Sequence, residues 1–161
     1  MRHAIFSLGF TFALALALAL AVTGCGSSFA MTAPDGFVEL DEDNSNYDAR
    51  FTSADGVVIS VRAIEHDPEG DLAFWVEAIT SRIRMNGGYA LLDTKDVRAG
   101  SGQTGTQLRF GRDQNGTPFK YWVTIFVTES HLHLVETGGR TEQFDAAEAR
   151  VERAIESLEL H

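Results

Sequence analysis

Hydrophobic and polar residues alternate along much of the chain, which is the pattern of half-buried strands. The alternation predicts strands over residues 47–52, 57–65, 89–97, 106–112, 119–128 and 131–137. Turn residues lie between neighbouring strands, notably Asp55-Gly56, Asn115-Gly116 and Glu129-Ser130. Steps such as Asp-Gly and Asn-Gly favour tight hairpins. The last four strands are joined by short connections, so we expect them to form an antiparallel meander.

The strand predicted over 119–128 differs from the others because both of its faces are hydrophobic. Alternate residues from Phe119 to Val127 are apolar, and Trp122 and Phe126 lie on the opposite side. A sheet face that is exposed to water would be polar at alternate positions. We therefore expect this central strand to be covered on both sides.

Two segments carry the helical period, and the first of them lies between the second and third predicted strands. Its apolar face consists of Leu72, Trp75, Val76, Ile79 and Ile83. Asp67 is expected to cap the beginning of this helix, with Pro68 at the first helical position. The glycines of Asn86-Gly87-Gly88 are expected to end it.

The second helix lies near the end of the chain. Its predicted buried face consists of Phe144, Ala147, Val151, Ile155 and Leu158. Asp145 is the expected N-cap, and Glu148 is the matching acidic residue of a capping box. One helix is thus available for each face of the sheet. The pattern predicts an α+β fold, in which an antiparallel sheet of about six strands is flanked by helices as an α/β/α sandwich.

The N-terminal segment has the layout of an export signal. Arg2 and His3 precede an uncharged apolar run from Phe10 to Val22. A helix that spans a bilayer needs about 20 apolar residues, so a permanent transmembrane helix is the weaker interpretation of this shorter run.

The apolar run ends in Val22-Thr23-Gly24-Cys25, which resembles the lipobox of bacterial lipoproteins. The resemblance implies that residues 1–24 are a lipoprotein signal peptide, cleaved between Gly24 and Cys25. It also implies a diacylglycerol on the sulfur of Cys25 and an acyl chain such as palmitate on the new N-terminus. Two or more such chains anchor a protein stably. Gly26 stands where Asp is associated with retention in the inner membrane, which implies the outer membrane, facing the periplasm.

Ordinary secretion is a second interpretation of the same segment. Ser28 and Ala30 are small residues at another possible cleavage site, where the cut would come after Ala30. That cut would discard Cys25 and leave the product free in the periplasm. Both interpretations place the protein in the bacterial cell envelope.

Composition adds to this picture of an exported domain. The 161 residues carry 23 Asp and Glu against 13 Lys and Arg, for a formal charge of −10. Such an acidic chain repels polyanions, so we expect no nucleic acid among its partners. The single cysteine excludes an internal disulfide and a cysteine-based structural zinc site. Beyond the signal we expect a flexible tether over 25–36 and one domain over 37–161.

The predicted order of elements resembles the PsbP-like family, which includes small bacterial envelope lipoproteins of the DcrB kind. The resemblance covers residues from about 37 to 160: a hairpin, a helix that contains Trp75, a four-strand meander, and a terminal helix that closes on Ile155-Glu156-Ser157-Leu158. Members of this fold are mostly accessory or binding proteins, so the resemblance implies a role without catalysis. It assigns no role to a particular residue, because the likeness lies in the order of the elements.

Three motifs that could carry chemistry have simpler interpretations. Residues 100–105 read Gly-Ser-Gly-Gln-Thr-Gly, but a strand follows them where a dinucleotide site needs a helix, so we expect a hairpin loop. Asp41, Asp43 and Ser45 resemble the start of a calcium loop that lacks the later Gly and Glu, so we expect a solvated acidic turn. Ser130 and His131 are adjacent in sequence. Because neighbouring residues of a strand point to opposite faces, we do not expect them to form a catalytic pair.

A metal site is the remaining candidate. His131 and His133 lie two positions apart on a predicted strand and so share a face, with Glu129 next along it and His66 able to join from another strand. Imidazole and carboxylate ligands suit zinc or copper. The competing interpretation places the intervening leucines in the core and the histidines on a polar or partly covered surface.

Two classes of function follow. The first is an envelope-anchored lipoprotein, held to membrane lipid through Cys25, with a non-catalytic binding or accessory role toward an unidentified envelope protein. The second is a periplasmic metal-binding protein that uses His131 and His133. We expect neither a catalytic residue nor a cofactor, because the sequence singles out no nucleophile and no pair of acid and base.

Overall fold

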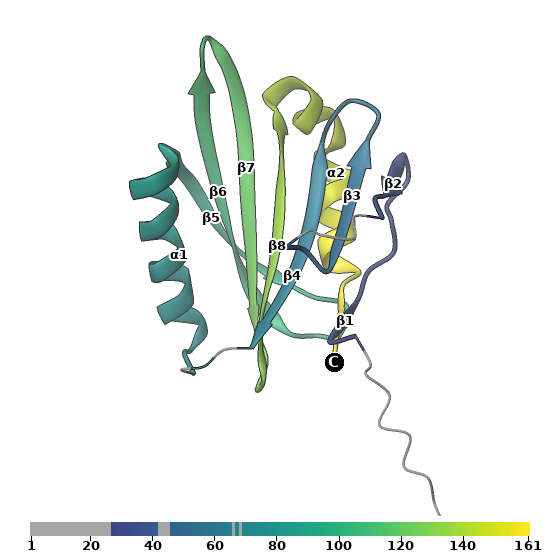
Figure 1. Cartoon of the computed structure of the whole chain (residues 1–161), viewed down its shortest axis with the longest axis vertical. Helices are drawn as coiled ribbons and strands as arrows, with labels where there is room; N and C mark the ends of the chain where they lie inside the picture. The colour runs from purple at the N-terminus through teal and green to yellow at the C-terminus, as the bar shows by residue number, and fades with distance from the viewer. Residues whose placement is uncertain (1–26, 42–45, 66, 68) are drawn as a thin grey trace, which may run out of the picture.

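The computed structural model describes residues 27–161 apart from 42–45, 66 and 68 (Figure 1). The predicted signal peptide, Cys25 and His66 therefore lie outside the described residues, as does most of the predicted acidic turn. The elements in chain order are β1 (Phe29–Ala30), β2 (Phe37–Glu39), β3 (Ala49–Ser53), β4 (Val58–Glu65), α1 (Leu72–Gly87), β5 (Ala90–Arg98), β6 (Thr104–Gln114), β7 (Thr117–Val127), β8 (His131–Arg140), α2 (Thr141–Glu156) and β9 (Glu159–Leu160).

A seven-stranded sheet forms the centre of the molecule, with its strands in the order β2-β3-β4-β8-β7-β6-β5. Strands β5 to β8 form the predicted antiparallel meander. Strand β4 joins the first hairpin to the meander by pairing with β8, from Val58 opposite Gly138 to Glu65 opposite His131. The predicted α+β sandwich is confirmed. The sheet has seven strands rather than about six, because the short segment Phe37–Glu39 adds β2 at one edge.

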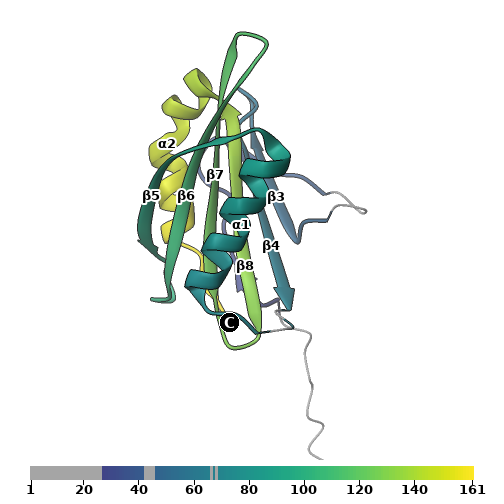
Figure 2. The same ribbon diagram turned by 90° about the vertical axis from the view of Figure 1, so that its left-hand side faces the viewer.

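The two helices cover opposite faces of this sheet (Figures 1 and 2). Strand β7 supplies hydrophobic side chains to both layers. Trp122 and Phe126 belong to the core that includes α2. Val123 and Ile125 belong to the core against which α1 packs. The predicted burial of the central strand on both faces is therefore confirmed.

Helix α2 is an integral part of its layer. Its buried residues are Phe144, Ala147, Val151, Ala154 and Ile155. The ring of Phe144 meets that of Trp122 edge to face, with 4.7 Å between their centroids. Arg109 of β6 stacks over Trp122 at 4.0 Å and pairs with Glu152 at 2.7 Å. Apolar burial and charge pairing thus fix the same helix to the same face.

Helix α1 is held more loosely. The apolar face predicted from the sequence does point at the sheet, but its residues are only half-buried, and none of the helix is fully buried. Gly88 ends the helix in the left-handed conformation, at φ 64°, as the glycine pair predicts. Among the described residues, neither helix is long and apolar enough to span a membrane.

Both helices begin at residues other than those predicted. Asp71, not Asp67, is the N-cap of α1, and its Oδ1 accepts a hydrogen bond from the Phe74 amide at 2.7 Å. Local sequence does not decide between two aspartates one helical turn apart. Helix α2 begins at Thr141, so Asp145 lies inside it and pairs with Lys120. This earlier start brings Phe144 onto the buried face of the helix, opposite Trp122.

The segment predicted as a flexible tether is partly a strand. Strand β1 pairs with β9, with Phe29 opposite Leu160. The amide of His161 donates to the carbonyl of Ser28 at 2.9 Å, and Phe29 is 7% exposed within the core under α2. The tether expected over 25–36 is therefore wrong from Phe29 onward. A two-residue strand has no periodicity to recognise, and its partner lies at the other end of the chain.

The unequal packing of the two helices can be tested with a matched pair of substitutions. Ile155 in α2 is 1% exposed, whereas Ile79 in α1 is half-buried. Ile155→Ala should lower the free energy of unfolding by about 2–5 kcal/mol, and Ile79→Ala should lower it by less than about 2 kcal/mol. Urea denaturation of both variants measures the difference. Equal losses would show that α1 is packed as tightly as α2.

Candidate functional site

A groove lies between α1 and the sheet, where the loose packing of the helix leaves space. Its volume is about 530 Å³, within the range of pockets that hold small organic ligands. Strands β7 and β8 supply the floor with Val123, Leu132 and Leu134. Helix α1 supplies the roof with Trp75, Ile79 and Ile83. The middle of the groove is therefore hydrophobic above and below.

Four polar side chains lie together beside this hydrophobic middle, and three of them, Arg62, Tyr121 and Glu136, line the groove. Arg62 of β4 pairs with Glu136 of β8 at 2.7 Å, and the ring of Tyr47 lies 5.1 Å from the Arg62 guanidinium. The negative charge of Glu136 also acts on the phenol groups of Tyr121 and Tyr47. Burial raises the pKa of both tyrosines, and the negative charge of Glu136 raises it further. Both phenols are thus neutral. We call Arg62, Glu136, Tyr47 and Tyr121 the polar cluster.

Two further arginines lie near the C-terminal end of α1. Arg82 lines the groove from the helix and forms no ion pair with any residue that the structure describes. Arg112 of β6 stacks over Tyr89, which also lines the groove, at 4.7 Å. Its Nη1 donates to the carbonyl of Gly87 at 3.3 Å. This end of the groove is therefore cationic.

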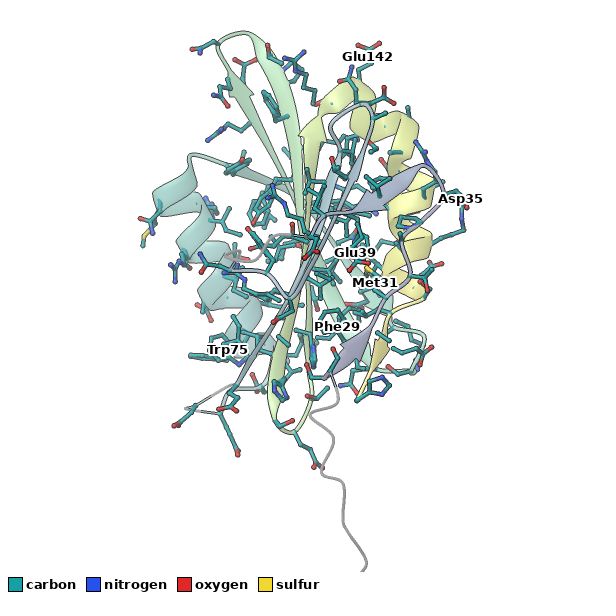
Figure 3. All side chains as sticks on the ribbon, turned by 45° about the vertical axis from the view of Figure 1, so that its right-hand side comes forward. Phe29, Met31, Asp35, Glu39, Trp75 and Glu142 are labelled. Atoms are coloured by element: carbon teal, nitrogen blue, oxygen red, sulfur yellow. The ribbon has the colours of Figure 1, made fainter. Side chains whose placement is uncertain are left out.

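The opposite end of the groove lacks such charges. Ile64, Trp75 and Leu132 line it beside the turn between β7 and β8. Figure 3 places Trp75 and Phe29 toward this same end of the sheet, on opposite faces. The groove thus runs from an apolar end, level with β1, to a cationic end near Tyr89.

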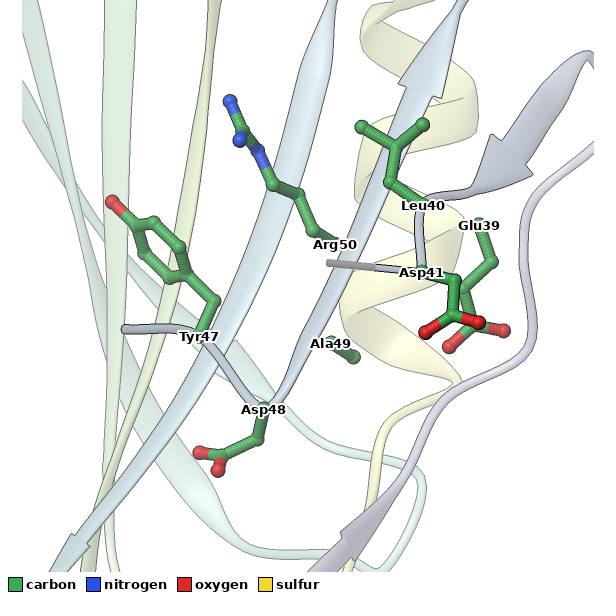
Figure 4. A pocket seen from close by; sticks show the side chains of 7 residues that line it. All are labelled: Glu39, Leu40, Asp41, Tyr47, Asp48, Ala49 and Arg50. Carbon is green, nitrogen blue, oxygen red and sulfur yellow. The ribbon is translucent and has the colours of Figure 1, made fainter. Parts of the chain in front are cut away.

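A second hollow lies at the edge of the sheet beside β3 (Figure 4). It is lined by Glu39, Leu40, Asp41, Tyr47, Asp48, Ala49 and Arg50. Figure 4 shows the ring of Tyr47 and the guanidinium of Arg50 extending away from the carboxylate of Asp48. The walls are mainly polar, and the hollow borders residues 42–45, which the structure does not describe. The groove beneath α1 is the better candidate for a binding site because it combines an apolar interior with a few placed polar groups.

The residues predicted to hold a metal are only partly brought together. The rings of His131 and His133 lie 5.7 Å apart. Glu129 lines a different hollow, together with Glu69 and Asp71. No group of three His, Cys, Asp or Glu side chains that could hold a metal ion occurs among the described residues, which do not include His66.

One interpretation of the sequence places His133 on a polar or partly covered surface. The structure does not. His133 is fully buried, and neither ring nitrogen has a hydrogen-bond partner among the described residues. The ring of Phe29 packs against it edge to face at 6.4 Å. Burial lowers the pKa of His133 to about 4, with the charge of His131 adding to the effect and that of Asp48 opposing it. His133 is thus a neutral core residue beneath β1.

Two other motifs are settled by the structure. The glycine-rich segment is the hairpin loop between β5 and β6, where Gly102 has φ 90° and donates to the carbonyl of Ala99, so that prediction is confirmed. Ser130 and His131 do not point apart: Ser130 Oγ lies 2.8 Å from His131 Nδ1. The alternation rule fails for this pair because Ser130 belongs to the turn rather than to β8.

The burial of His133 predicts how stability depends on pH. The native state binds a proton at His133 with a pKa of about 4, against 6.5 for an ordinary histidine. The unfolded chain therefore binds protons first, and stability should be complete above about pH 6.5 and fall toward pH 4. The full loss corresponds to on the order of 3 kcal/mol.

Urea denaturation between pH 6.5 and 5 measures this effect above the range in which most carboxylates titrate. His133→Leu should flatten the dependence on pH over this interval. His131→Gln is the matched control, since it removes the neighbouring imidazole and should leave the dependence largely in place. If His133→Leu keeps the slope of the parent, His133 is not its source.

Comparison with solved structures relates this arrangement to a known fold. No family model matches the sequence, and no curated protein does. LpqN of Mycobacterium tuberculosis, described as involved in cell envelope biogenesis, superposes with a TM-score of 0.64 at 14% identity, over 81% of this chain and 83% of LpqN.

Two other structures are similar. The cyanobacterial PsbP of Synechocystis gives a TM-score of 0.55 at 12% identity, over 86% of this chain and 96% of that protein. PA94 of Pseudomonas aeruginosa, a protein of unknown function and putative regulator, gives 0.53 at 10% identity, over 83% and 84%. Likeness at such low identity concerns the fold alone. The chain therefore has the PsbP-like fold that the order of its elements resembles.

Proposed function

We propose that this chain is a lipid-anchored protein of the bacterial cell envelope that binds a ligand in the groove beneath α1 and does not convert it. The main support for this proposal is the groove itself. It joins a hydrophobic floor and roof to a few placed polar groups, as small-molecule sites do. The description of LpqN as a protein of cell envelope biogenesis supports a role in the same compartment.

The packing of Phe29 supports cleavage before Cys25. A cut after Ala30 would remove β1, leave β9 without its partner, and take a buried phenylalanine out of the core. Loss of a buried Phe side chain costs about 3–5 kcal/mol. A mature domain that keeps β1 needs a cut farther toward the N-terminus, which the lipobox supplies.

The position of β1 also orients the domain in this proposal. Only three residues separate Cys25 from Phe29. Fully extended, that stretch reaches on the order of 14 Å. An acylated Cys25 would therefore keep the end of the sheet that bears β1 close to the membrane surface. Placement in the outer membrane and an envelope protein as partner remain predictions from the sequence.

Labelling with an alkyne analogue of palmitate tests the anchor. The parent chain should incorporate the label and yield a mature N-terminus at Cys25 by mass spectrometry, whereas Cys25→Ala should lose the label. Ala30→Leu is the matched control: it places a large exposed residue at the alternative cut and should change neither result. A mature chain that begins at Met31 would establish ordinary secretion instead.

Titration with dodecyl maltoside below its micellar concentration tests the groove. The mature chain carrying Cys25→Ser should bind one molecule, measured by calorimetry and by the change in tryptophan emission, to which Trp75 in the groove contributes. Ile79→Glu places a charge in the apolar roof and should weaken binding at least tenfold, because the carboxylate must be desolvated. Met85→Glu makes the same kind of change on the exposed side of α1 and should have no effect. Absence of binding, or equal losses in the two variants, would refute the proposed site.

A further inference from the structure

The charge around the groove differs in sign from the charge of the whole chain. The chain carries a formal charge of −10, yet Arg62, Arg82 and Arg112 lie along one end of the groove or beside it. Among the described residues, only Arg62 of these three has a carboxylate partner, Glu136. Two cations are therefore left uncompensated at the mouth of an apolar groove. Such a site attracts anions even when the protein as a whole is acidic.

Two buried arginine nitrogens beside the groove lack a hydrogen-bond acceptor. Arg62 Nε and Arg112 Nε are buried without a hydrogen-bond partner among the described residues, and both are donors. Glu136, the carboxylate that lines the groove, already accepts a hydrogen bond from Arg62 at 2.7 Å. An unpaired buried donor costs about 1–3 kcal/mol. The groove is thus short of acceptor oxygens.

The shape of the groove restricts the rest of the ligand. Its volume of about 530 Å³ suits a small organic molecule rather than a folded partner. Val123, Leu132 and Leu134 below and the apolar face of α1 above leave a slot for hydrocarbon. The absence of any fully buried residue in α1 makes this helix the part of the wall that can move to admit a chain.

From these three observations we infer that the groove binds an amphipathic anion. Its hydrocarbon chain lies between α1 and the sheet, and its carboxylate or phosphate is bound by Arg82, with Arg112 adding positive charge. This inference rests on the proposed function, because it names the class of ligand for the same groove. A neutral amphipath would fill the slot but leave the two cations without a counter-charge.

Three probes separate the contributions of tail and head: dodecyl phosphate, dodecyl maltoside and inorganic phosphate. We expect the mature chain with Cys25→Ser to bind dodecyl phosphate at least tenfold more tightly than dodecyl maltoside at low salt. Sodium chloride should reduce this preference, because it screens the exposed charge of Arg82. Inorganic phosphate alone should bind at least a hundredfold more weakly, since it lacks the tail.

Substitutions on α1 locate the anion. Arg82→Gln should weaken dodecyl phosphate about tenfold and leave dodecyl maltoside unchanged. Arg84→Gln is the matched control, because Arg84 is an exposed arginine of the same helix that lines a different hollow. It should change neither affinity. Both side chains are exposed, so neither substitution should disturb folding.

The outcomes distinguish this inference from the proposed function. If the two detergents bind equally, or if Arg82→Gln and Arg84→Gln act alike, the anionic head group is refuted while the groove stands. If inorganic phosphate competes as well as dodecyl phosphate, the site holds a free anion and the amphipathic ligand is refuted. If neither detergent binds, the proposed function fails together with the inference.

Discussion

The burial of β7 on both faces is the constraint on which the rest of this structure depends. Trp122 and Phe126 on one side and Val123 and Ile125 on the other must all leave water. Each face of the inner strand therefore needs its own covering layer, and in this protein each layer is a helix. The chain supplies one from the connection between β4 and β5 and the other from its C-terminal region.

The two helices meet very different surfaces. On the face of α2, charged residues of the sheet pair with the helix, as Arg109 does with Glu152, and the rest of the face is apolar. Lys95 also donates to Glu152, and this contact, together with Arg109, lowers the pKa of that carboxyl despite partial burial. Apolar packing and charge pairing therefore act together there, and the helix closes completely onto the sheet.

On the face of α1 the polar cluster belongs to the sheet itself. Arg62 and Glu136 pair with each other close to the tyrosines, while the apolar face of α1 offers them no polar partner. Full contact would strip water from an ion pair without compensation, which costs more than the additional apolar burial returns. The helix therefore packs over the hydrophobic rows only, and the groove is the space that remains.

The same contrast explains which features the sequence could predict. Periodicity predicts the strands, the burial of the central strand on both faces and the apolar faces of both helices. Each of these features depends only on the spacing of apolar residues that are close together in the sequence. The polar cluster could not be predicted in this way. Arg62 and Glu136 are 74 positions apart, and in the sequence each is only a polar residue on a predicted strand. The pairing of β1 with β9 joins the two ends of the described chain, and no local sequence pattern predicts it. The burial of His133 was missed for a related reason, since the residue that covers it, Phe29, comes from that same pairing.

Strand β8 connects the proposed anchor with the proposed binding site. Leu132 and His133 are neighbours on it and point to opposite faces: Leu132 belongs to the floor of the groove, and His133 contacts Phe29 of β1. The apolar end of the groove and β1, the strand nearest to Cys25 in the sequence, therefore lie at the same end of the seven-stranded sheet, on its opposite faces. In a membrane-bound chain, the short stretch between Cys25 and Phe29 keeps that end near the bilayer. The apolar end of the groove then lies toward the lipid and the arginines lie away from it, so that a bound amphipathic anion would be aligned with its charged group toward the aqueous side.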